Sequence, residues 1–146
     1  MLLAYLIGND DLHLKNISVM RSPDNKDRVY DKLKPHYDNQ CTEFYETGML
    51  NNLAMPLLEA GDDASQGFSE AYQYFGFYTH ADFMTLAENI GLPEKAADNS
   101  IKASAKATQK IKDLIESAYI PGEYKPKYTE LVKQRYKAIC AEHISV

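Results

Sequence analysis

The chain has 146 residues, of which 45% are hydrophobic and 25% charged, and its formal net charge is −5. This acidic balance argues against a nucleic-acid-binding protein, because no basic surplus is available to neutralise phosphates. No apolar run approaches the roughly 20 residues that a membrane-spanning helix needs, and the N-terminus lacks the features of a signal peptide. We therefore expect one cytoplasmic domain over 1–146, with Cys41 and Cys140 as reduced thiols.

The first feature in chain order is a polar loop, Gly8–Asn16, which lies between two apolar segments. The segment before it, Leu2–Ile7, is typical of the end of a buried helix. The segment after it, Ile17–Met20, alternates and contains β-branched residues, which predicts a short strand. A loop held between two regular elements is a suitable place for catalytic groups.

The spacing inside this loop indicates a chemistry. Asp11 and Asn16 are five positions apart, which is the offset in the catalytic loop of protein kinases, where the Asp accepts the substrate hydroxyl proton and the Asn holds a metal ion. Lys15 lies between them and could neutralise charge on a transferred phosphoryl group. The same spacing also arises by chance, so a polar turn with an Asx cap remains the alternative.

The next segments predict a hairpin followed by a second acidic site. Arg28–Leu33 is expected to return as a strand, and Pro35 prevents both a helix and a central strand just beyond it. Asp38 then closes the segment, where kinase folds place their second metal ligand. A solvated turn is an equally good reading of Asp38, and Asp31 competes for the ligand role.

The second half of the chain predicts helices. Thr79 and Asp82 have the spacing of a capping box, and Gly91 is expected to end the helix that they start. Apolar residues recur with helical period from Asn99 to Tyr119 and from about Lys127 to Glu142. The predicted fold class is mainly α (α+β): a kinase-like C-lobe with a small β-hairpin next to the catalytic loop and a C-terminal helical bundle.

Several segments together resemble one family, the HipA-like kinases. Gly8–Ser18 is similar to that family's catalytic loop, approximately G-[NA]-x-D-x-H-x-K-N-x-S, and Leu33–Asp38 resembles its following L-x-P-x-Y-D segment. The stretch from His80 to Ala97 looks like part of the family's helical C-terminal subdomain. The connection between the two motifs looks a few residues longer than the family pattern, which indicates a small insertion in the hairpin.

The resemblance implies a Ser/Thr protein kinase that uses ATP and Mg²⁺, and it implies a role for each matching residue. Asp11 would be the catalytic base and His13 a residue that organises the loop. Lys15 would touch the phosphates, and Asn16 and Asp38 would be the Mg²⁺ ligands. The resemblance thereby favours Asp38 over Asp31.

The resemblance also implies partners. Many members of the family are toxins of toxin–antitoxin pairs, which act on a protein substrate and are restrained by a HipB-like antitoxin. The chain has no G-x-G-x-x-G or G-x-x-x-x-G-K-[ST] phosphate-binding motif. We therefore expect a C-lobe only, with the catalytic loop and metal-binding segment in 1–60 and a helical subdomain in 61–146. The ATP-binding lobe would be supplied in cis or in trans, and this chain alone would be inactive.

Two other functions remain open at this point. The chain could be a non-catalytic helical module that binds an antitoxin or another protein, with the acidic loop as a remnant. It could also be a lipid or small-molecule kinase, although an acidic chain without a basic patch disfavours anionic lipid substrates.

Overall fold

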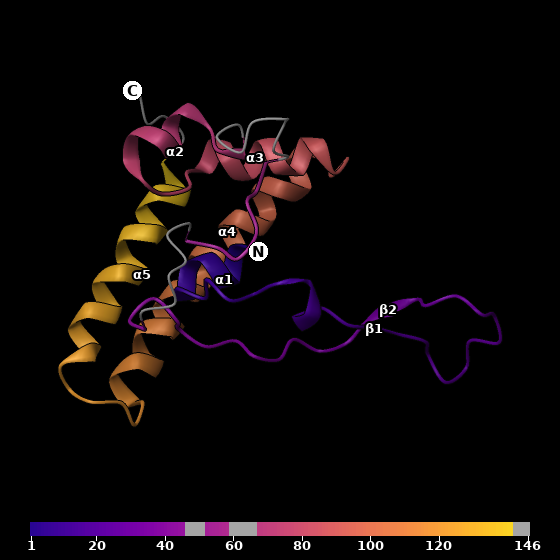
Figure 1. Cartoon of the computed structure of the whole chain (residues 1–146), viewed down its shortest axis with the longest axis horizontal. Coiled ribbons are helices and arrows are strands. Elements are labelled where there is room, and N and C mark those ends of the chain that lie inside the picture. The colour runs from indigo at the N-terminus through magenta and orange to yellow at the C-terminus, as the bar shows by residue number, and fades with distance from the viewer. Residues whose placement is uncertain (46–51, 59–66, 142–146) are drawn as a thin grey trace.

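A computed structural model describes residues 1–45, 52–58 and 67–141, and in these ranges the chain is mainly helical with one small hairpin (Figure 1). The predicted fold class, mainly α with a minor β component, is confirmed. The elements in chain order are α1 (Leu2–Ile7), the 3₁₀ helix η1 (Leu14–Asn16), β1 (Val19–Met20), β2 (Lys32–Leu33), α2 (Glu70–Phe75), α3 (His80–Asn89), α4 (Glu94–Ser117) and α5 (Tyr124–Cys140).

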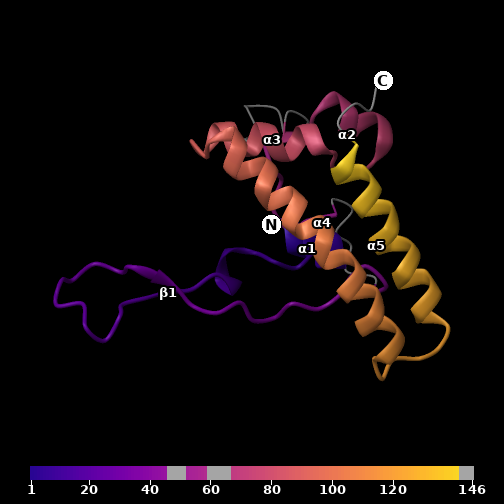
Figure 2. The ribbon, with the colours of Figure 1, turned by 180° about the vertical axis from the view of Figure 1, so that it is seen from behind.

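The hairpin forms an arm that extends away from the helices, as Figures 1 and 2 show from opposite sides. Its strands are antiparallel, with Val19 opposite Leu33 and Met20 opposite Lys32. The hairpin was predicted correctly, but both predicted strands were too long. A two-stranded ladder with no packed face is only marginally stable, and here Val19 and Leu33 are 51% and 65% exposed.

The helical body is built around α1, which packs against both α4 and α5, while α3 packs against the same two helices. Tyr5 of α1 lies in an aromatic cluster, with ring centroids 6.0 Å from Tyr78 and 5.5 Å from Phe83. Its hydroxyl donates a hydrogen bond of 2.7 Å to the Tyr78 carbonyl oxygen. Because Tyr5 and Tyr78 are fully buried, these contacts fix the helix that leads directly into the polar loop.

The predicted start and end of α3 are confirmed. Thr79 and Asp82 form the capping box, in which the Asp82 carboxylate accepts from the Thr79 backbone N–H at 2.7 Å and from its hydroxyl at 2.8 Å. Gly91 has a φ of +71°, the left-handed conformation expected just beyond a helix end.

Helix α4 begins directly after Pro93, where Leu92 and Pro93 predict a helix start. Helix α5 begins at Tyr124, three residues before the expected Lys127, because Pro126 is tolerated in a first turn. The expected end of α5 at Glu142 lies outside the described residues, as does the boundary between 1–60 and 61–146. None of the helices described is long and apolar enough to cross a membrane.

A glycine series tests how tightly α1 is joined to the polar loop. Gly8 has a φ of +72°, and a Cβ there would lie 2.8 Å from Leu131 Cδ2 and 3.2 Å from Cys41 Sγ. We expect Gly8→Ala to lower the free energy of unfolding by about 2–4 kcal/mol, because left-handed strain and overpacking add. Gly91→Ala introduces the same left-handed strain, but its added Cβ meets open space. It should lower the free energy of unfolding by about 1 kcal/mol.

Gly122→Ala is the matched control, since its backbone is outside the left-handed region and nothing lies within 4 Å of the added atom. It should change the free energy of unfolding by less than about 0.5 kcal/mol. Urea denaturation followed by circular dichroism measures all three. Equal losses for Gly8→Ala and Gly91→Ala would mean that Leu131 and Cys41 move aside, and that the joint is not tightly packed.

Candidate active site

The polar loop begins where α1 ends. Gly8 takes the left-handed conformation, and the backbone N–H of Asn9 donates back to the Ala4 carbonyl oxygen at 2.9 Å. These two features close the helix end and turn the chain away from it. The chain then passes through Asp11 into η1, which carries Lys15 and Asn16.

A second segment, 38–43, is bound to this loop by buried hydrogen bonds. The Gly8 carbonyl oxygen accepts from the backbone N–H groups of Thr42 and Glu43 at 2.8 and 3.2 Å. The Asp10 backbone N–H donates to the Thr42 hydroxyl oxygen at 2.8 Å, and that hydroxyl in turn donates to the Asp10 carboxylate. Asp10 and Thr42 are both buried. The two segments that carry the predicted site residues are therefore held in one unit.

The structure brings Asn16 and Asp38 together across a separation of 22 residues. The Asn16 side-chain NH₂ group donates to the Asp38 carboxylate at 3.1 Å and to the Asp11 backbone carbonyl oxygen at 3.2 Å. The Asp11 carboxylate itself remains 47% exposed. Asn16 therefore links the predicted catalytic residue with the second predicted metal ligand.

His13 and Lys15 are less closely engaged. His13 Nε2 lies 3.9 Å from the Asp11 carboxylate, and its buried Nδ1 has no hydrogen-bond partner among the described residues. Lys15 has an exposed side chain, and in the described part of the chain its ammonium group forms no ion pair. The backbone of Lys15 is nevertheless anchored, because the Tyr37 hydroxyl donates to its carbonyl oxygen at 2.9 Å. Tyr37 directly precedes Asp38, so this hydrogen bond joins η1 to the segment that carries Asp38.

Asp31, the competing acid, is engaged within the arm. Its carboxylate accepts from the Ser22 backbone N–H and from the Ser22 hydroxyl, both at 2.8 Å. These hydrogen bonds stabilise the charged form and lower the pKa of Asp31. Asp31 closes the turn between β1 and β2, and it is Asp38 that meets Asn16.

The donor set of Asn16 and Asp38 fits Mg²⁺. The amide NH₂ group of Asn16 makes both of the hydrogen bonds above. A metal shared by the two residues would take the Asn16 amide oxygen and an Asp38 carboxylate oxygen as ligands. Mg²⁺ prefers such oxygen ligands, and it is commonly bound by one or two protein groups plus phosphates and water. Among the described residues there is no cluster of three or more His, Cys, Asp or Glu side chains that could hold a metal.

The nearest thiol is not suited to nucleophilic chemistry. Cys41 and Cys140 are both free, as expected. Cys41 lies on the segment that carries Asp38, and burial raises the pKa of its thiol. The protonated form therefore dominates near neutral pH, whereas a nucleophilic cysteine needs the thiolate.

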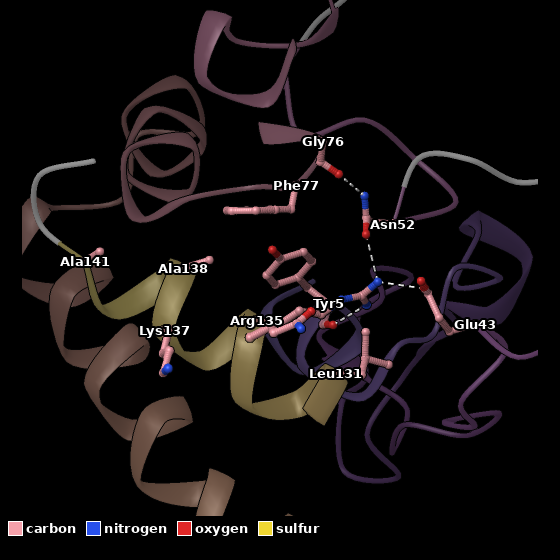
Figure 3. Close-up of a pocket in the computed structure, with 11 residues that line it drawn as sticks. Tyr5, Glu43, Asn52, Gly76, Phe77, Leu131, Arg135, Lys137, Ala138 and Ala141 are labelled. Atoms are coloured by element: carbon pink, nitrogen blue, oxygen red, sulfur yellow. Dashed lines mark hydrogen bonds and ion pairs between the residues drawn. The ribbon is translucent and has the colours of Figure 1, made fainter. Parts of the chain in front are cut away.

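A pocket in the helical body lies away from these residues. A cavity of about 440 Å³ opens between α1, α5 and the residue pair Gly76–Phe77 (Figure 3). The buried guanidinium group of Arg135 lines this cavity. It donates hydrogen bonds to the Tyr5 carbonyl oxygen, Glu43 and Asn52. None of Asp11, Lys15, Asn16 and Asp38 lines this cavity, so the candidate site is the exposed surface at the base of the arm.

Comparisons with known proteins show the family of the chain. Residues 1–111 match the HipA-like C-terminal domain, and the chain belongs to this family. A protein of Haemophilus influenzae described as "Putative kinase" is 33% identical over 123 residues, which cover 81% of this chain. The match covers 34% of that relative, so the chain spans about a third of its length.

Sequence reasoning missed two residues of the site. Asn9 and Thr42 are buried polar residues that join the loop to the Asp38 segment. Asn9 stands inside the recognised motif, but nothing in the local pattern shows that its side chain turns inward. Thr42 lies in a stretch without periodicity, so no sequence signal could have found it.

Proposed function

We propose that this chain is the C-terminal part of a HipA-like Ser/Thr protein kinase, which transfers the γ-phosphate of ATP to a protein hydroxyl. The observation that carries the proposal is the meeting of Asn16 and Asp38 at 3.1 Å beside the backbone of Asp11. Three residues from two separate segments converge there with the side-chain types that phosphoryl transfer requires. The family membership of residues 1–111 supports the same reaction.

Each residue has a defined role in this proposal. Asp11 accepts the proton of the substrate hydroxyl as its oxygen bonds to the γ-phosphorus and ADP leaves, and its exposure allows a substrate to reach it. Asn16 and Asp38 would hold Mg²⁺, which neutralises phosphate charge when bound. Lys15 contributes a positive charge to the phosphates, and His13 lies against the Asp11 carboxylate and limits its rotation.

A partner lobe completes the site in this proposal. The arm and the adjoining η1 expose large apolar side chains: Val29 and Tyr30 on the arm and Leu14 of η1 are 66–71% exposed. Such a surface is typical of one that another polypeptide covers. We propose that a nucleotide-binding lobe, in cis or in trans, packs on this arm, and that the chain alone does not transfer phosphate. The match covers 34% of the Haemophilus influenzae relative. The rest of that relative is long enough to contain such a lobe.

The biological setting is proposed from the family resemblance. We infer a cytoplasmic toxin of a toxin–antitoxin pair that acts on a protein substrate and is restrained by a HipB-like antitoxin. The formal charge of −5 supports the absence of direct contact with nucleic acid or anionic membranes, since such contact needs a basic surface.

Calorimetry with Mg-ATP distinguishes the kinase from a non-catalytic interaction module. We expect the wild-type chain to bind Mg-ATP weakly, because the phosphates meet only half of their site, and to lose this binding in EDTA. Asp38→Asn should abolish the heat of binding, while Asp31→Asn, which changes an acid of the arm, should retain it. Binding that persists in EDTA and in Asp38→Asn would contradict the assigned metal ligands.

A further inference from the structure

Asn9 is a polar side chain that is only 1% exposed, and both ends of its amide are used. Its NH₂ group donates to the Asp38 backbone carbonyl oxygen at 2.9 Å, across 29 residues of sequence. Its carbonyl oxygen accepts from the Asp11 backbone N–H at 3.1 Å. One short amide therefore contacts the backbones of both acids of the proposed site.

The helix end does not explain this side chain. The cap at Gly8 uses the backbone N–H of Asn9, which any residue except proline would supply. The cohesion of the two segments does not explain it either, because Gly8 and Thr42 already join them through buried hydrogen bonds. What the Asn9 side chain adds is the position of Asp38 relative to Asp11.

Asp38 needs such support because its backbone is in an unfavourable conformation. Its φ of +57° lies in the left-handed region, which is uncommon for a residue other than glycine. Its side chain is exposed, so packing does not hold it. A residue in this conformation persists when its surroundings fix it, and the partly buried hydrogen bond from Asn9 is a contact that does so.

We propose that Asn9 is a positioning residue, which sets the metal-binding carboxylate of Asp38 against the proton-accepting Asp11. The inference rests on the proposed kinase function and extends it to a residue that touches neither metal nor substrate. Groups that orient a metal ligand through a hydrogen bond, without touching the metal, contribute about 10–100-fold to metal affinity. Removing the amide should therefore weaken metal binding more than its effect on folding would explain.

The test uses Mn²⁺, a paramagnetic ion that also prefers oxygen ligands, as a probe of the whole 146-residue chain. Titration of the ¹⁵N-labelled protein should broaden the backbone amide signals of Asn16 and Asp38 first. Asn9→Ala should raise the Mn²⁺ concentration at half-broadening by about tenfold. The matched control is Asn52→Ala, which also removes a bridging amide, here between Tyr72, Gly76 and Arg135, and should leave that concentration unchanged.

Circular dichroism must show both variants folded at the temperature of the titration. If Asn9→Ala does not fold, Asn9→Asp replaces it, since it keeps the shape and the acceptor for the Asp11 N–H but lacks the amino donor. A midpoint for the folded Asn9 variant within about twofold of the Asn52→Ala value would overturn the positioning role, because loss of a group that orients a metal ligand predicts a larger shift. If Mn²⁺ fails to broaden Asn16 and Asp38 selectively in the wild type, the proposed metal site itself is wrong, and the role of Asn9 falls with it.

Discussion

Replacing Asp11 by Asn in the full-length protein is expected to lower the rate of phosphoryl transfer from ATP by about 10²–10⁴-fold, the usual contribution of a general base. Asn has the same shape but cannot accept the proton of the substrate hydroxyl. Asp38→Asn should be at least as damaging, because it removes the only anionic ligand of the proposed metal pair. Both side chains are half-exposed or exposed, so neither change should unfold the protein.

The measurement is transfer of labelled γ-phosphate to protein, with thermal unfolding recorded for each variant. Asp31→Asn is the control. It also removes a carboxylate, but the Asp31 carboxylate binds Ser22 and not Asn16. It should keep the wild-type rate. Wild-type activity in the full-length Asp11→Asn or Asp38→Asn protein would show that the site has been assigned to the wrong residues.

The second large effect is on stability and concerns Arg135. Its side chain is 3% exposed and donates to the Tyr5 carbonyl oxygen at 2.6 Å, to Glu43 at 2.7 Å and to Asn52 at 2.8 Å (Figure 3). Its guanidinium also lies 4.9 Å from the centroid of the Tyr5 ring. One side chain of α5 thus joins α1 to the segment that follows the site.

Arg135→Met is expected to lower the free energy of unfolding by about 3–5 kcal/mol, because it leaves the partners of a buried charge unpaired. Lys133→Met is the control on the same helix. Lys133 pairs with Glu130 at 3.4 Å on the surface, and such exposed pairs contribute less than about 1 kcal/mol. Urea denaturation measures both variants, and losses of equal size would mean that the Arg135 contacts contribute little beyond a surface pair.

Local features were predictable from the sequence because they depend on residues a few positions apart. The capping box at Thr79 and Asp82 needs a spacing of three, and the end of α3 at Gly91 needs a residue that accepts a positive φ. The helical period of the last segment predicted a C-terminal helix, which the structure has as α5. The strand lengths were overestimated, because alternation indicates a strand whether or not anything packs on it.

The sequence by itself determined the polar loop with Asp11 and Asn16 and the buried helix that precedes it. The family resemblance favoured Asp38 over Asp31, but only the tertiary structure shows the contacts of each acid: Asp38 meets Asn16, whereas Asp31 binds Ser22. The tertiary structure also decided that Asn9 turns inward, since its partner Asp38 lies 29 residues further along the chain. Contacts at such separations depend on how α1, η1 and the returning strand pack together, and no local spacing encodes that arrangement.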